Sequence, residues 1–179
     1  MIIRIEQNPG EECPHVVRMM VEIPQGSSNK YVYNKELGLF ELSRSLYSPL
    51  HYPGDYGFIP GTISADGAAL DVLCLVTQPS FTGCLVYVRP VAVLDAQDGD
   101  DTDHKILAVP YRDPRYEQIQ TLDQLAAHVQ REIEHFFEMY KELEGRNMHI
   151  RGWLGRDSAF QLIEESRERY LTEHSPAAV

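Results

Sequence analysis

Short apolar or alternating stretches run through the first two thirds of the chain, separated by Gly, Pro, Asn or Asp. β-branched and aromatic residues dominate these stretches, which is typical of the strands of a small barrel or sandwich. The sequence NKELG at 34–38 predicts the turn of a hairpin. We expect strands at 16–24, 30–34, 37–46, 70–76, 84–95 and 105–111.

The pattern changes after Pro114, where apolar residues begin to recur at steps of three and four. This spacing predicts an amphipathic helix with Gly145 as its C-terminal stop. We expect a second helix from about Ser158 to Tyr170, followed by a frayed tail over 171–179. The apolar face of the first helix comprises Leu122, Leu125, Ala126, Val129, Ile133, Phe136, Tyr140 and Leu143. The simplest architecture is a single domain, 1–179, in which helices pack on a β-barrel.

Charge and composition narrow the choice of partners. The chain is 43% apolar and 24% charged, and its formal charge is −11. A negative field disfavours nucleic acids and anionic membranes, so we expect neither as a partner. A small anion in a locally basic pocket remains compatible with this charge.

The three cysteines, Cys13, Cys74 and Cys84, have no metal-ligand spacing, and their odd number does not predict a disulfide framework. Cys74 and Cys84 lie in apolar runs, so we expect them to be reduced core residues. The N-terminus has no long apolar region, which predicts neither a secretion signal nor a membrane span. We therefore expect a cytoplasmic protein.

Two acidic segments are candidates for metal binding. In ADGAALDV at 65–72, Asp66 and Asp71 are separated by residues that carry no carboxylate. The segment DAQDGDDTDHK at 95–105 contains five aspartates. Alone, such a run is more often a solvated loop, but Mg²⁺ prefers oxygen ligands, and Asp98 and Asp103 could join the first pair. Four carboxylates that converge would repel one another unless a cation is bound.

A second group is basic or phenolic. Each member has an ordinary interpretation as a surface charge or a core residue, and only convergence on the acidic group would make a phosphate site. In such a site, Arg binds phosphate oxygens in pairs and Lys supplies a point charge. The group comprises Lys30, Arg44, Tyr52, Tyr56, Lys105, Tyr140 and Lys141.

Six segments in order along the chain resemble the soluble family I inorganic pyrophosphatases. The combination of HYPGDYGFIPGT with a following DGxxxDVL is highly specific, and the resemblance runs from about Val16 to Glu144 and on to the region of Trp153. The segments are EIPQGSSNKYVY (22–33), SRSLYSPLHYPGDYGFIPGT (43–62), ADGAALDVL (65–73), RPVAVLD (89–95), DHKILAVP (103–110) and HFFEMYKELE (135–144).

The resemblance implies an α+β, mainly β fold: an OB-like five-stranded β-barrel flanked by two C-terminal helices. It also implies hydrolysis of pyrophosphate with Mg²⁺, or with Mn²⁺ or another divalent ion, by a protein that self-associates as a hexamer or smaller oligomer. By position, Asp66, Asp71 and Asp103 match the ligands of the principal metal pair, and Asp71 bridges the two ions. Asp98 and Asp103 match ligands of a metal that arrives with the substrate.

The resemblance also assigns the remaining candidates. Tyr56 matches a tyrosine near the metals and the attacking water, Tyr52 one that lines the pocket, and Glu22 a supporting acid. The catalytic group that the resemblance implies comprises Tyr56, Asp71, Lys30 and Arg44. The phosphate-binding positions that it implies are Lys30, Arg44, Lys105, Tyr140 and Lys141.

The chain departs from the family pattern at the centre of the site. Its loop reads DGAALDV where the family has DGDPxDV, so Ala68 replaces the aspartate that acts as general base and Ala69 replaces a proline. Val32 replaces an acid that helps to hold the last metal, and Gly99 stands where some relatives have another acid. Asp55 and Glu22 are candidates for a replacement base, although Asp55 belongs to the common YPGDYG pattern.

Three functions follow from this combination of retained and lost groups. The first is pyrophosphate hydrolysis with altered or reduced activity, because a positioned base contributes about 10²- to 10⁴-fold. The second is an enzyme that acts on an organic phosphate or diphosphate, since the lost polar groups leave a more apolar wall. The third is a non-catalytic protein that binds pyrophosphate.

Overall fold

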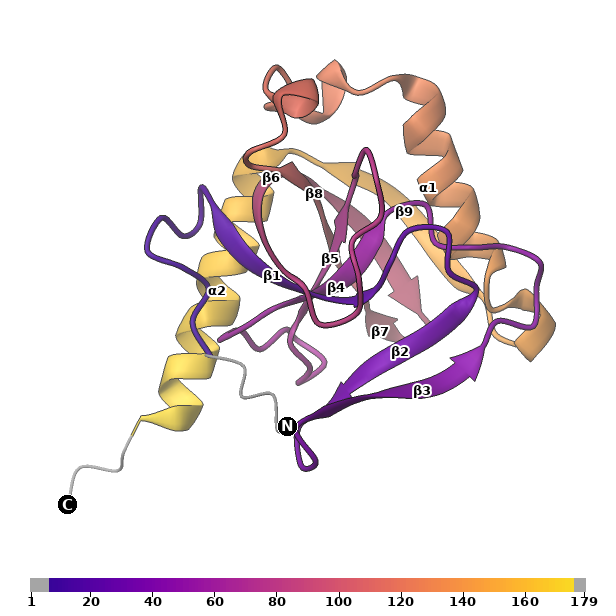
Figure 1. Ribbon diagram of the computed structural model, residues 1–179, viewed down its shortest axis with the longest axis horizontal. Coiled ribbons are helices and arrows are strands. Elements are labelled where there is room, and N and C mark those ends of the chain that lie inside the picture. The colour runs from indigo at the N-terminus through magenta and orange to yellow at the C-terminus, as the bar shows by residue number, and fades with distance from the viewer. Residues whose placement is uncertain (1–6, 176–179) are drawn as a thin grey trace.

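The computed structural model describes residues 7–175, and its main feature is a closed ring of five strands (Figure 1). The strands pair in the order β1–β4–β5–β8–β6, and β6 pairs with β1 to close the ring. All these pairs are antiparallel except β5 with β8. The strands are β1 (Val17–Ile23), β4 (Asp55–Ile59), β5 (Leu70–Cys74), β6 (Leu85–Asp98) and β8 (Lys105–Pro110). This arrangement confirms the predicted five-stranded barrel.

The ring contains β4, a strand that we did not predict, because its sequence is dominated by the turn-like residues of YPGDYGFIPG. Gly57 explains this composition. A Cβ atom at this position would lie 1.9 Å from the carbonyl oxygen of Met20 on β1, so only glycine permits the two backbones to approach this closely. Two further unpredicted strands, β7 (Asp101–Thr102) and β9 (Met148–Leu154), pair with the long strand β6.

Strands β2 (Asn29–Asn34) and β3 (Leu39–Ser45) form a separate hairpin beside the barrel (Figure 1). The amide of Gly38 donates to the carbonyl of Asn34 at 2.8 Å, which confirms the predicted turn. Lys30 lies directly opposite Arg44 in the register of the hairpin. This pairing places two of the predicted phosphate-binding cations side by side.

The two long helices, α1 (Ala127–Met139) and α2 (Arg156–His174), lie on opposite sides of the barrel (Figure 1). α1 is shorter than predicted, because the ends of its apolar pattern fall in 3₁₀ turns, η2 (Leu122–Gln124) and η3 (Glu142–Glu144); a third, η1 (Pro114–Tyr116), precedes them. Gly145 ends η3 with a φ of 73°, which confirms its role as a stop.

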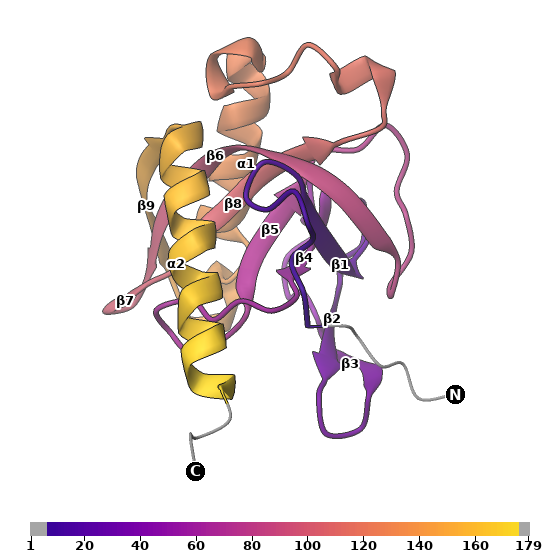
Figure 2. The same ribbon diagram turned by 90° about the vertical axis from the view of Figure 1, so that its left-hand side faces the viewer.

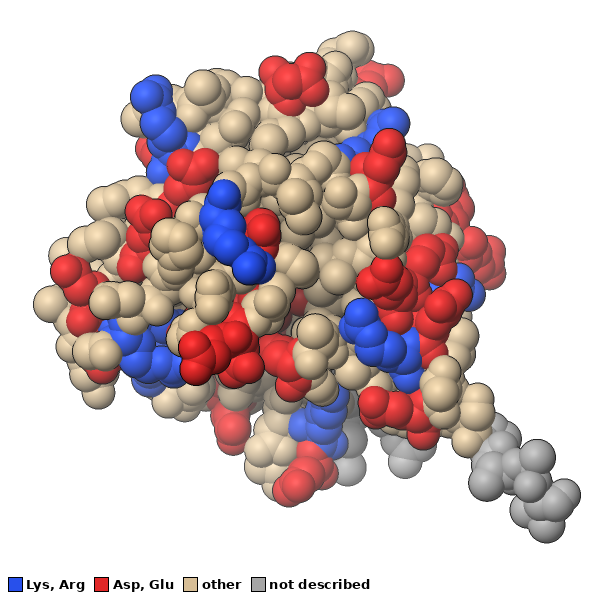
Figure 3. Space-filling view, turned by 180° about the vertical axis from the view of Figure 1, so that it is seen from behind, with Lys and Arg blue, Asp and Glu red and all other residues tan. Residues whose placement is uncertain are grey.

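α2 continues four residues beyond the end that we predicted. Residues 171–174 are therefore helical and were wrongly assigned to the tail; residues 176–179 lie outside the described residues. α2 runs along the barrel in Figure 2 and packs on it through Ala159 and Ile163. α1 contributes Ile133, Phe136 and Phe137 to the other core cluster, which also contains residues of the barrel strands and of β9. Within residues 7–175, no helix is long and apolar enough to cross a membrane. On the face seen from behind, acidic and basic side chains are interspersed among other residues (Figure 3).

Candidate active site

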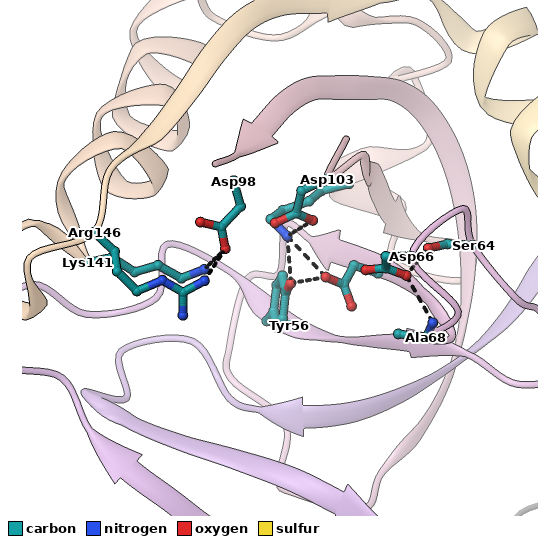
Figure 4. Close-up of polar contacts among 10 residues, drawn as sticks. Tyr56, Ser64, Asp66, Ala68, Asp98, Asp103, Lys141 and Arg146 are labelled. Atoms are coloured by element: carbon teal, nitrogen blue, oxygen red, sulfur yellow. Dashed lines mark hydrogen bonds and ion pairs between the residues drawn. The ribbon is translucent and has the colours of Figure 1, made fainter. Parts of the chain in front are cut away.

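The candidate site begins where β5 and β8 run side by side. These are the only parallel pair in the ring of described strands, and their register sets Asp71 beside Lys105. Tyr56 reaches the same point from β4, and Asp103 lies two residues before Lys105. Residues that are distant in sequence are therefore brought together by the pairing of three adjacent strands (Figure 4).

Lys105 is the centre of this group. Its ammonium is 2.7 Å from Oδ1 of Asp103, 3.0 Å from Oδ2 of Asp71 and 3.0 Å from the hydroxyl of Tyr56. The Tyr56 hydroxyl in turn donates to Oδ2 of Asp71. The Lys105 side chain is only 2% exposed, whereas those of Asp71 and Asp103 are 31% and 20% exposed, so the ammonium is buried and the carboxylates are open to solvent on their far side.

Burial and charge together fix the protonation states here. Burial alone would lower the pKa of Lys105, but the carboxylates of Asp71 and Asp103 outweigh it and raise this pKa above its ordinary value. Burial, reinforced by Asp71, raises the pKa of Tyr56 well above the ordinary range. At neutral pH Lys105 is therefore an ammonium and Tyr56 a neutral phenol.

Asp66 lies in the loop before β5. The hydroxyl of Ser64 donates to its Oδ1 at 2.5 Å, and the amide of Ala68 donates to the same oxygen at 2.9 Å. Gly67, between them, has a φ of 85°, in the left-handed region that glycine adopts most readily. This local turn places Asp66 beside the Lys105 group in Figure 4.

Asp98, at the end of β6, belongs to a second cluster. It accepts from Lys141 Nζ and from Arg146 Nη2, each at 2.7 Å. Burial tends to raise the pKa of Asp98, but the hydrogen bond and charge of Lys141 outweigh it and lower this pKa below the ordinary value. Sequence reasoning missed Arg146. The only available signal was a basic residue immediately after the Gly145 turn.

The basic residues converge on one side of the site. Arg44 Nε donates to Oε1 of Glu144 at 3.0 Å, and Arg44 Nη2 is buried and has no hydrogen-bond partner among residues 7–175. Burial lowers the pKa of Lys30, and the positive charges of Arg44 and Lys141 lower it further. Sequence reasoning also missed Glu144, which carries no feature that distinguishes it from the neighbouring acids.

The two other predicted tyrosines form the apolar floor beside these cations. The Tyr52 ring lies 5.4 Å from that of Tyr56 and 6.4 Å from that of Tyr140, centre to centre. Lys141 Nζ lies 5.2 Å from the centre of the Tyr140 ring. Burial raises the pKa of Tyr52, so its hydroxyl remains protonated. The rings of Tyr52, Tyr56 and Tyr140 all belong to the core cluster, so the site lies directly against the core.

A cavity of about 190 Å³ adjoins Asp71 on the side where Ala68 and Ala69 replace residues of the family pattern. Glu22 is one of its lining residues and accepts from the amide of Tyr33 at 2.8 Å. Burial raises the pKa of Glu22 to about 7. Val32 lies in β2 opposite Glu41 and is half-buried. The cavity lining comprises Glu22, Tyr33, Lys35, Phe58, Ala68, Ala69 and Asp71.

The donor set fits a hard divalent cation, because Asp66, Asp71 and Asp103 supply only carboxylate oxygens. In the structure these oxygens are engaged by Lys105, Ser64 and a backbone amide. Over the described range, no three acidic, His or Cys side chains are arranged closely enough to form a ready-made metal site. Binding a cation therefore requires these carboxylates to exchange some of their present contacts.

The remaining aspartates of the acidic loop do not share one role. Asp95 accepts from Arg151 Nη2 at 2.7 Å and lies 3.1 Å from His104 Nε2, so it belongs to a separate surface network. Asp101 forms half of the short strand β7. Of the five aspartates, Asp98 and Asp103 lie in the clusters described above. Asp55 is fully buried and accepts from Gln25 and Ser80, which fixes its role as structural support.

Comparisons with known proteins match this chain to inorganic pyrophosphatases in both sequence and structure. A family model described as inorganic pyrophosphatase matches residues 19–171. The inorganic pyrophosphatase of Methanosarcina acetivorans is 46% identical over 159 residues, 89% of this chain and 95% of that protein. The one from Geobacillus stearothermophilus is 42% identical over 155 residues, 87% of this chain and 94% of that protein. The crystal structure of inorganic pyrophosphatase from Thermus thermophilus aligns with a TM-score of 0.90 at 39% identity and covers 94% of this chain and 98% of that one.

The fold and the family match define an enzyme of the hydrolase class. More specifically, the chain belongs to the inorganic pyrophosphatase family. This result confirms the resemblance seen in the sequence, and the likeness to the Thermus structure confirms the expected fold.

Proposed function

We propose that this protein hydrolyses inorganic pyrophosphate to two phosphates with Mg²⁺, at a rate reduced by the absence of a carboxylate at Ala68. The observation that carries the proposal is the convergence of Asp71, Asp103 and Tyr56 on one buried lysine. Next to it lie Lys30, Arg44 and Lys141, whose charges interact. Oxygen ligands for a cation and cations for a phosphate therefore share one site.

The positive groups would bind and orient the substrate. Arg44 has a buried Nη2 without a partner, which suits it to a phosphate oxygen. Lys30, Lys105 and Lys141 would supply point charge, and the hydroxyl of Tyr140 would donate to a phosphate oxygen. Tyr52 would line the pocket. These groups are held before the reaction begins, which is the condition for stabilising charge that develops on the transferring phosphoryl group.

The carboxylates would hold the metal ions. We assign Asp66, Asp71 and Asp103 to the principal pair, with Asp71 shared, and Asp98 with Asp103 to an ion that accompanies the substrate. When bound, Mg²⁺, or Mn²⁺ or another divalent ion, neutralises phosphate charge and lowers the pKa of a bound water. Tyr56, kept protonated by burial, would donate a hydrogen bond near the attacking water.

The loss of the base sets the expected rate. Ala68 offers no proton acceptor, and Val32 removes a further acid near the site. Glu22 is the nearest candidate to substitute, because it lines the same cavity as Ala68 and Asp71. Since a positioned base contributes about 10²- to 10⁴-fold, binding would be retained while turnover falls by a factor in this range.

The proposal includes two properties of the whole molecule. We propose self-association into a hexamer or smaller oligomer, which the exposed aromatic side chains Tyr47 and Phe81, 67% and 66% exposed, favour. We also propose a cytoplasmic location, because Cys13, Cys74 and Cys84 are all free thiols. Size-exclusion chromatography with light scattering tests the first property, and imaging of a tagged protein tests the second.

A phosphate-release assay with pyrophosphate tests the activity. We expect slow release that requires Mg²⁺ or Mn²⁺ and stops with a chelator. No release above background across several metals and pH values would contradict the proposal. Mg²⁺-dependent binding without turnover, measured by calorimetry, would indicate a binding protein. Nucleoside, prenyl and sugar diphosphates in the same assay test an organic substrate, because the cavity beside Ala68 and Ala69 offers apolar volume that pyrophosphate does not use.

A further inference from the structure

The cavity beside Ala68 has a definite position relative to the two charged halves of the site. Figure 4 shows Lys141 and Arg146 on one side of Tyr56, and Asp66 and Ala68 on the other. The cavity is lined by Ala68, Ala69 and Asp71, so it lies on the second side. It is therefore separated from the cluster of positive charge by the Lys105 group.

This position determines which reactant would fill the cavity. In phosphoryl transfer the attacking and leaving oxygens lie roughly in line with the phosphorus atom between them. The leaving phosphate carries the larger negative charge, so it belongs with Arg44, Lys141 and Arg146. The attacking oxygen must then approach from the opposite side, through the cavity. The cavity beside Ala68 can therefore hold the nucleophile but not the leaving group.

The size and lining of the cavity exceed what a water molecule needs. At about 190 Å³, it compares with roughly 30 Å³ for one water in the liquid, which leaves room for on the order of six non-hydrogen atoms. The Tyr33 and Phe58 rings, stacked with centres 6.2 Å apart, and two alanine methyl groups provide an apolar wall. Lys35 and Ala68 are exposed, so the cavity opens to solvent on their side. Asp71 and Glu22 provide oxygen acceptors for a hydroxyl at the other end.

We propose that this protein also transfers a phosphoryl group from pyrophosphate to a small aliphatic alcohol or diol bound in the cavity beside Ala68 and Ala69. The inference rests on the proposed binding of pyrophosphate at the neighbouring cations. The alcohol oxygen bonds to the nearer phosphorus, and the bond from that phosphorus to the bridging oxygen breaks. The bridging oxygen leaves with the second phosphate, which receives the alcohol proton. One pyrophosphate and one alcohol thus give one phosphate monoester and one phosphate.

The products of pyrophosphate consumption distinguish transfer from hydrolysis. ³¹P NMR counts both, because hydrolysis yields two phosphates and transfer yields one phosphate and one ester. The protein is incubated with Mg²⁺, pyrophosphate and either propane-1,2-diol, glycerol or methanol. We expect ester from the two larger alcohols, at a higher ratio of ester to phosphate than from methanol at equal concentration. Methanol as an equal or better acceptor would overturn the inference, since the cavity would confer no preference.

Variants test whether the cavity is the acceptor site. Ala69→Leu fills it, and we expect the ratio of ester to phosphate from propane-1,2-diol to fall by at least about tenfold, as for a pocket that loses room for one or two methylenes. Ala65→Leu is the matched control, because Ala65 is exposed in the same loop and does not line the cavity. An unchanged ratio in Ala69→Leu would overturn the inference.

A binding measurement without metal separates failure of this inference from failure of the proposed function. With ¹³C-labelled alanine methyl groups, propane-1,2-diol should shift the signals of Ala68 and Ala69 but not that of Ala65. If pyrophosphate is consumed and only phosphate appears, the transfer is wrong and the hydrolysis stands. If pyrophosphate remains intact with every alcohol, both are wrong. Absence of a methyl shift would also overturn the acceptor site.

Discussion

Arg44 and Glu144 are a hundred residues apart in the sequence, and their side chains form an ion pair of 3.0 Å at the edge of the site. The carboxylate engages Nε of the guanidinium, while Nη2 stays buried and without a partner among residues 7–175. Glu144 thus orients Arg44 and at the same time places negative charge where a phosphate would bind.

Glu144→Gln separates these two effects, because the amide oxygen retains the hydrogen bond to Arg44 and removes the charge. We expect KM for pyrophosphate to fall by roughly threefold to tenfold, on the order of 1 kcal/mol of reduced repulsion. Steady-state kinetics measure this change. Glu142→Gln, an exposed neighbour in η3, is the control and should leave KM unchanged. An increased KM in Glu144→Gln would show that orientation depends on the full charge.

Ala68→Asp, alone or with Val32→Glu, restores the acids that the family pattern contains at these positions. We expect pyrophosphate hydrolysis to rise by about 10²- to 10⁴-fold, the contribution of a positioned general base. Initial rates of phosphate release provide the measurement. Ala65→Asp adds the same charge to the same loop and should have little effect. Variants that bind Mg²⁺ and pyrophosphate but gain no rate would show that another step limits turnover.

Lys105→Met removes the buried counter-charge of Asp71 and Asp103, whose side chains are 31% and 20% exposed. We expect a loss of about 1–3 kcal/mol in the free energy of unfolding, less than for a fully buried ion pair because solvent screens the remaining carboxylates. Urea unfolding with a chelator measures this loss. Saturating Mg²⁺ should recover more of the stability in the variant than in the wild type, because the cation replaces the missing charge between the carboxylates. Lys35→Met, at an exposed lysine, serves as the control.

The carboxyl of Glu22 makes the free energy of unfolding depend on pH, and its raised pKa determines the direction of that dependence. Burial raises its pKa from 4.5 to about 7. Between pH 4.5 and 7, Glu22 is therefore protonated in the folded state and ionised in the unfolded state. The contribution of Glu22 to stability is therefore greatest in acid and falls as pH rises toward 7. Glu22→Gln removes this loss and should be more stable than the wild type above pH 7, by at most about 3 kcal/mol.

Urea unfolding of metal-free protein at several pH values between about 5 and 8 checks this prediction. The stability difference between Glu22→Gln and the wild type should grow with pH across this range. Glu36→Gln, at an exposed glutamate in the hairpin turn, should show no such trend. A difference that is constant or shrinks with pH would contradict the raised pKa.

Sequence patterns captured the barrel wherever strands are apolar or alternating, and missed it where glycine dictates the packing. The segment around Gly57 looks like a turn, because the physical requirement is a close approach to Met20, which no local pattern records. α1 illustrates a different limit. The apolar period continues beyond the helix at both ends, but there the chain forms 3₁₀ turns that bury none of their residues, and Leu143 is 61% exposed.

The candidate site was predictable as a set of residues but not as a set of contacts. The family resemblance identified Asp71, Asp103 and Lys105, and the structure shows that the lysine joins the two carboxylates. Arg146 and Glu144 were missed because their partners, Asp98 and Arg44, come from distant segments. Such pairings depend on how the segment after α1 lies against β3 and β6, and nothing in the local sequence specifies that.

The β2–β3 hairpin lies outside the closed ring, yet it carries Lys30 and Arg44. Tyr33 ties the hairpin to the barrel through Glu22 and Phe58, but between the described strands the hairpin has no backbone ladder to the ring, so we expect its hydrogen bonds to open at a lower free energy than global unfolding. Warming should abolish affinity for the anion while the ring still resists amide exchange. Thermal inactivation of this protein would then begin as local melting of one ribbon, well before the molecule as a whole denatures.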